Sequence, residues 1–253
     1  MESSSKSRYI KLAIQLLENY RGRDKIIRIS SYVTMLLSSV GKKGGAMNIK
    51  FNVITQQLNL CRTILRLFDD LPMLALTATY GFGKHEKVPG IGLLKGLENL
   101  VYSLFFPVEH IAWLAQVKVL QGYHEGKWIV GCIGLWAIAL VLSITRNLIN
   151  LKAMKRQMED AQRQLKIEGG GGISSLELTP TKSVVELKLS QYNMRLDLLK
   201  NCADLCNAIN WLPPGFLWSG KIPTPITAIT GMLSSYLGLY QCASNMISDK
   251  KKV

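Results

Sequence analysis

The sequence predicts an all-α integral membrane protein with amphipathic N-terminal helices and about two transmembrane helices. Apolar residues recur at helical spacing along most of the 253-residue chain, and no alternating β-type pattern persists. Two long stretches carry no charge. Charged residues make up 19% of the chain, below the roughly 25% typical of soluble domains, and the mean hydropathy is slightly positive.

Residues 1–126 are predicted to form a region of amphipathic helices. The first helix covers Tyr9–Tyr20 and is expected to break at Gly22. Asp24 is the expected N-cap of a second helix, in which apolar residues recur three and four positions apart as far as Val40. The glycine-rich turn Gly41–Gly45 ends that helix.

The stretch from Asn52 to Pro72 predicts a third helix with one apolar and one polar face. Arg62 and Arg66 lie four residues apart on the polar face, where their guanidinium groups are expected to contact lipid phosphates. An interfacial membrane helix has this pattern, and so has a helix packed into the protein's own bundle. The face expected to insert into the membrane consists of Phe51, Ile54, Leu58, Cys61, Ile64, Leu65 and Phe68.

A fourth apolar segment runs from Leu93 to Leu120 and is expected to be interrupted at Pro107. Residues 127–146 are the predicted first transmembrane helix, because Trp128–Thr145 contains 18 residues without a charge. The alternative for this stretch is a wholly buried helix of a soluble domain.

Residues 147–221 are predicted to form a basic helix, a glycine-rich linker that begins at Gly169–Gly172, and a further helical segment. That segment must end at Trp211–Gly215, which contains tandem prolines. Residues 222–248 carry no charge over 27 positions and are the predicted second transmembrane helix. Residues 249–253 form a basic tail.

The formal net charge of +14 indicates either a nucleic-acid partner or an anionic membrane surface. No RNA-recognition signature, zinc finger or basic zipper is present, so we expect anionic membrane lipids and no nucleic acid. The tail residues are Lys250, Lys251 and Lys252. The first two stand at the dilysine spacing of tails that bind vesicle coats, although a solvated basic end is the more common explanation of three terminal lysines.

The sequence offers no constellation that would support catalysis. The five scattered cysteines are expected to be free thiols, and the three histidines have no zinc-ligand spacing. Asp69 and Asp70 stand together, but a solvated helix end explains them better than a metal site does. We therefore expect a protein that is not an enzyme, with no catalytic residue, metal or cofactor.

Four stretches together resemble the peroxin-11 family of peroxisomal membrane proteins, specifically its gamma-type branch. They are "RDKIIR" (Arg23–Arg28), "CRTILRLFDDLPM" (Cys61–Met73), "PVEHIAWLAQVKVL" (Pro107–Leu120) and "ADLCNAINWLPPGFLWSGKIP" (Ala203–Pro223). The resemblance implies a multi-pass peroxisomal membrane protein that elongates the membrane and so promotes peroxisome fission and proliferation. It also implies homo-oligomers, hetero-oligomers with other family members, and recruitment of fission adaptors and a dynamin-type GTPase.

In that family an amphipathic helix remodels the membrane, and its counterpart here is about Asn48–Leu71. A peroxisomal channel or metabolite carrier is the alternative function. The resemblance implies cytosolic termini. However, the two predicted spans cannot place both the basic residues after residue 146 and the basic tail on the cytosolic side.

Overall fold

The computed structural model describes residues 2–81, 83, 86, 88, 90–168 and 182–250. This part of the chain contains eight α-helices and one short 3₁₀ helix, and no strand. The prediction of an all-α membrane protein is confirmed. Gly169–Gly172, most of the linker after it, and Lys251 and Lys252 lie outside the described residues.

Helices α1 (Glu2–Glu18) and α2 (Tyr20–Val40) are separated by Asn19, not by Gly22. The Asn19 side chain accepts hydrogen bonds from the backbone N–H groups of Arg21 (2.9 Å) and Gly22 (3.2 Å), which makes it the N-cap. The predicted cap, Asp24, lies inside α2. Gly22 is required for packing, because a Cβ atom there would lie 2.2 Å from the carbonyl oxygen of Leu16.

The predicted third helix is divided into three pieces: α3 (Ala46–Leu65), the 3₁₀ turn η1 (Arg66–Phe68) and α4 (Asp70–Tyr80). Pro72 was expected to end the helix but lies in the first turn of α4. A proline is tolerated there because the first N–H groups of a helix have no partner within the helix.

Helices α5 (Ile91–Gln116) and α6 (Glu125–Glu168) pack against each other as a hairpin. Pro107 does not interrupt α5, although it removes one backbone hydrogen bond. The predicted first span and the basic helix after it form one continuous helix, α6, because no glycine or proline separates them. With 44 residues, α6 is about 66 Å long at about 1.5 Å per residue.

Helices α7 (Lys182–Asn210) and α8 (Thr224–Lys250) complete the structure. The turn between them is held by Asn210, which donates to the carbonyl oxygen of Ile222 (3.1 Å) and accepts from its N–H (2.9 Å). The predicted helix end at Trp211–Gly215 is confirmed.

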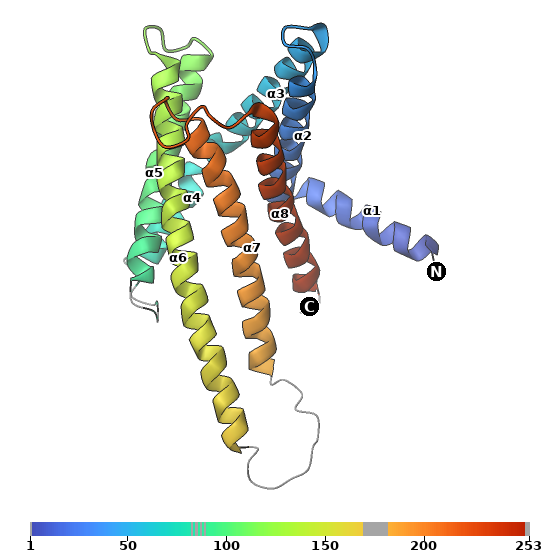
Figure 1. Ribbon diagram of the computed structural model, residues 1–253, viewed down its shortest axis with the longest axis vertical. Helices are drawn as coiled ribbons and strands as arrows, with labels where there is room; N and C mark the ends of the chain where they lie inside the picture. The colour runs from blue at the N-terminus through green and yellow to red at the C-terminus, as the bar shows by residue number, and fades with distance from the viewer. Residues whose placement is uncertain are drawn as a thin grey trace.

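The helices are arranged as a ring. Around it α3 contacts α2, α2 contacts α8, α8 contacts α7, α7 contacts α6 and α6 contacts α5, and α4 with η1 links α5 back to α3. Figure 1 shows α1 extending away from this ring and the C-terminal end of α6 extending beyond its neighbours. The ring surrounds a cavity of about 1170 Å³.

Candidate functional site

The apolar face of α3 is turned partly to the outside of the ring. Ile54, Cys61 and Ile64 are exposed, and Phe68 in η1 is 83% exposed. The other members of the predicted inserting face, Phe51, Leu58 and Leu65, are half-buried. The exposed half of this face is therefore available to a membrane.

The polar face of α3 is turned inward, where Arg62 and Arg66 are already paired. Arg62 Nε lies 2.9 Å from Asp24 Oδ1 of α2. Arg66 Nε lies 3.0 Å from Glu109 Oε2 of α5, and its Nη2 also pairs with that carboxylate. This arrangement differs from the lipid-phosphate contacts that we expected for both arginines. The ion pairs instead fix the rotation of α3 about its axis.

Asp24 is shared by two cations, since Lys25 Nζ lies 3.0 Å from its second carboxylate oxygen. Burial alone would raise the pKa of Asp24, but Arg62 and Lys25 more than offset this effect and hold the pKa well below its usual range. Asp24 is therefore ionised at physiological pH. Its contribution to stability is fully present above about pH 4, which is the pKa of an aspartate in an unfolded chain. The contribution is lost as the pH falls below that value towards the lower pKa of the folded state.

A second ion pair joins α2 to α7. Arg28 Nη2 lies 2.6 Å from Asp204 Oδ1, and both side chains are less than 10% exposed. Ser234 of α8 donates a hydrogen bond to the same carboxylate. The Arg28 guanidinium also lies 5.9 Å from the ring centroid of Trp136 in α6. One polar cluster thus connects four helices of the ring.

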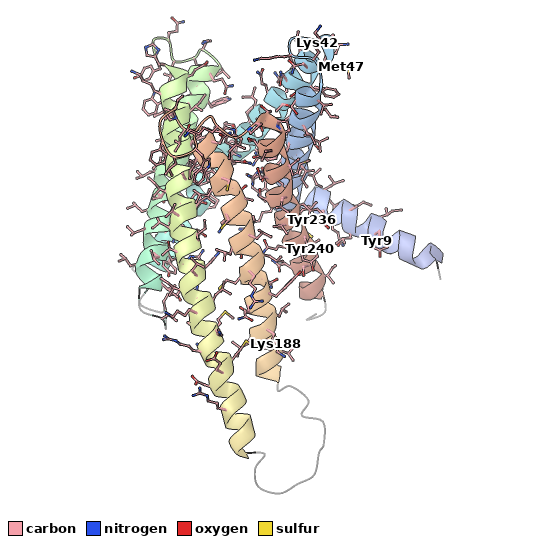
Figure 2. All side chains as sticks on the ribbon, viewed as in Figure 1. Tyr9, Lys42, Met47, Lys188, Tyr236 and Tyr240 are labelled. Atoms are coloured by element: carbon pink, nitrogen blue, oxygen red, sulfur yellow. The ribbon has the colours of Figure 1, made fainter. Side chains whose placement is uncertain are left out.

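Polar and small side chains are common in the interior of the bundle, and many large apolar side chains are exposed on its exterior. Its largest fully buried side chains are all polar, and they are Asn99, Asn207, Thr227, Ser234 and Ser235. Large apolar side chains are exposed on all eight α-helices, including Tyr9 of α1 and Tyr236 and Tyr240 of α8 (Figure 2). Soluble domains show the opposite distribution. Small and polar contacts between helices, with apolar residues outside, are typical of membrane bundles.

Two of the described helices are long and apolar enough to cross a membrane, and they are α5 and α6. The predicted first span, residues 127–146, lies within α6. The second was expected at residues 222–248, but α8 does not qualify by hydropathy and α5 takes its place. Ser234, Ser235 and Ala228 of α8 are buried in the ring, so the small and polar residues that make this stretch uncharged serve helix packing.

The cavity has two chemically different walls. Helices α2 and α3 contribute mainly charged and polar groups, including Lys25, Arg28 and Arg62. Helices α5 and α6 contribute mainly apolar and aromatic groups. Within the described residues no group of three or more potential ligands could hold a metal ion, and Asp69 instead accepts a hydrogen bond from Tyr20 (2.9 Å).

The chain was compared with known proteins. Residues 10–243 match the family model described as Peroxisomal biogenesis factor 11 (PEX11). The chain belongs to the PEX11 family. It is 35% identical over 231 residues to the human "Peroxisomal membrane protein 11C", covering 90% of this chain and 91% of that protein. It is 34% identical over 230 residues to the mouse protein of the same name, covering 89% and 90%. No solved structure matches.

These comparisons confirm the predicted family and its gamma-type branch, and they place this PEX11 protein in the peroxisomal membrane. The four stretches that carried the resemblance are far apart in the sequence but meet around the cavity. The first stretch contributes Asp24 and Arg28, and the second contributes Arg62 and Arg66. The third contributes Glu109 and the fourth Asp204. The residues of these stretches are typical of the family, but their local pattern does not predict that their charged residues pair with one another.

Proposed function

We propose that this PEX11 protein remodels and elongates the peroxisomal membrane through α3, and so promotes peroxisome fission and proliferation. The observation that carries the proposal is the orientation of α3. Its arginines pair inward with Asp24 and Glu109, which keeps Ile64 and Phe68 on the outer surface. An apolar helix face that enters one leaflet to a depth of about 5–10 Å expands that leaflet relative to the other, and the bilayer bends.

Imaging in cells tests this function directly. The tagged protein is expressed beside a peroxisomal membrane marker, and peroxisome length and number are measured. We expect longer and more numerous peroxisomes, because each added copy contributes another α3. Unchanged peroxisomes that nonetheless carry the protein would contradict the proposal.

We further propose that α5 begins and α6 ends on the same, cytosolic side of the membrane. The α5–α6 hairpin returns the chain to its starting side, which removes the conflict between the basic regions noted above. Lys152, Lys155 and Arg156 follow the apolar part of α6, whereas Lys118 and Lys127 stand at the turn. Basic residues favour the cytosolic side.

This topology makes a prediction for the α5–α6 turn. An epitope tag inserted after Gly122 should be protected from antibody when only the plasma membrane is permeabilised. A tag at the N-terminus should be labelled under the same conditions. Equal labelling of both tags would contradict the proposal that α5 and α6 both cross the membrane.

The role proposed here is not catalytic. It requires anionic membrane lipids, self-association or association with other family members, and fission adaptors that recruit a dynamin-type GTPase. The family resemblance supports these partners. The apolar exterior of the ring provides surface for contacts between copies within the bilayer.

A channel or metabolite carrier is a second candidate function, and the cavity is the observation that favours it. Charged groups within a membrane bundle mark solute pathways in many transporters. Purified protein in liposomes should then release a small entrapped anion faster than empty liposomes. A release rate equal to that of empty liposomes would remove this candidate and leave the remodelling proposal unaffected.

A further inference from the structure

We propose that the cavity inside the ring is a binding site for one anionic amphiphile, that is, a molecule with an oxyanion head group and an apolar chain. This inference concerns the interior of the ring. It depends neither on membrane remodelling by the outer face of α3 nor on transport.

The charge of the cavity favours an anion. Its lining contains six basic and three acidic residues, and two of the basic residues, Arg28 and Lys200, pair with Asp204 and Asp197 outside the lining. The imbalance is clearest at Asp24, whose single carboxylate is shared by Lys25 and Arg62. Burial lowers the pKa of Lys25, and the nearby Arg28 and Arg62 lower it further, against the opposing effect of Asp24. An oxyanion beside these groups would relieve the repulsion between the cations and supply acceptors for their N–H donors.

The opposite wall favours an apolar chain. Phe105 and Phe106 of α5 pack edge-to-face with ring centroids 5.5 Å apart, and both line the cavity. Trp136 of α6 and Trp211 stack at 6.1 Å and line it as well. A solute that is polar throughout would leave this apolar wall without an apolar contact. A wholly apolar solute would leave Lys25 and Arg62 to share the single carboxylate of Asp24.

The size of the cavity also favours a chain-bearing ligand. Its volume of about 1170 Å³ slightly exceeds the roughly 300–1,000 Å³ of sites for drug-sized ligands, as a long-chain molecule requires.

Native mass spectrometry of the full chain released from detergent tests the site by counting bound molecules. The probes are dodecyl phosphate, dodecanol and inorganic phosphate, which separate the head group from the chain. We expect saturable binding of one dodecyl phosphate, with the other two probes at least about tenfold weaker, because each lacks one half of the recognition. Equal binding of dodecanol, equal binding of inorganic phosphate, or no saturable binding would each overturn the proposal.

Two substitutions locate the site. Lys25→Gln leaves Asp24 paired with Arg62 and should weaken dodecyl phosphate binding about tenfold, through loss of one charge-assisted hydrogen bond. Lys25→Arg should retain binding. The matched control is Lys95→Gln, because Lys95 also shares a carboxylate, Glu98, with an arginine, Arg146, but does not line the cavity. Equal weakening by the Lys25→Gln and Lys95→Gln variants would overturn the assignment.

Discussion

Replacing Ile64 and Phe68 together by glutamate should abolish tubulation of liposomes by the purified protein. These residues are 44% and 83% exposed and lie four positions apart on the outer surface of α3 and η1. Each contributes about 1.5–3 kcal/mol when it is buried in an apolar medium. The double substitution therefore removes about 3–6 kcal/mol of insertion free energy, before the cost of placing two carboxylates at the membrane is added. Insertion of this face should fall by at least about 100-fold.

The measurement is electron microscopy of liposomes together with alkaline extraction of membranes from cells. The variant should remain in the membrane pellet, because α5 and α6 are unchanged. The matched control is Asn52→Asp with Gln56→Glu, which adds the same charge at two exposed positions of α3 away from the apolar face. Tubulation should survive in this control. Tubules formed by the Ile64→Glu/Phe68→Glu variant would show that α3 does not bend the membrane by insertion.

Removing either partner of the Arg28–Asp204 pair should destabilise the bundle by about 3–5 kcal/mol. Arg28→Met leaves the Asp204 carboxylate buried with only Ser234 as a hydrogen-bond donor, and Asp204→Leu leaves a buried guanidinium without a counter-charge. Each single substitution should therefore lower the midpoint of thermal unfolding substantially. The Arg28→Met/Asp204→Leu double variant should recover most of the loss, since no buried charge is left unpaired.

Thermal unfolding of the purified protein in nanodiscs, followed by circular dichroism, provides the measurement. Lys155→Met serves as the control, because Lys155 pairs with Glu159 at 3.9 Å on the exposed part of α6. An exposed pair of this kind contributes about 0–1 kcal/mol, so the midpoint should barely move. If Arg28→Met has no larger effect than Lys155→Met, the cluster around Asp204 does not hold the ring together.

The positions of most helices could be read from the sequence, and the errors lie at their junctions. The break between α1 and α2 was expected at Gly22 but occurs at Asn19, because the Asn19 side chain caps α2 while Gly22 permits close contact with Leu16. The stretch around Pro72 was read as a helix end. The chain turns there but continues as α4. Pro72 lies in the first turn of α4, where a backbone N–H group would have no partner within the helix.

The apolar stretch Trp128–Thr145 could be assigned because its length and lack of charge are properties of the sequence itself. The second span could not be assigned in this way. The stretch at residues 222–248 and α5 both contain long apolar segments, and α5 carries Lys95, Glu98 and Glu109 within it. Only the packing shows that Glu98 pairs with Lys95 and Arg146 and that Glu109 pairs with Arg66, which leaves the outer surface of α5 apolar.

By itself the sequence determined the all-α class, the amphipathic pattern of α3, the apolar stretch within α6 and the four stretches typical of the PEX11 family. The tertiary structure alone decided that Arg62 of α3 and Arg66 of η1 face inward and that the four stretches line a cavity. The physical reason is the distance along the chain. Periodicity shows which residues share a helix face, but the partners of Arg62, Arg66 and Arg28 lie 38, 43 and 176 positions away. No local pattern specifies which carboxylate such a face will meet.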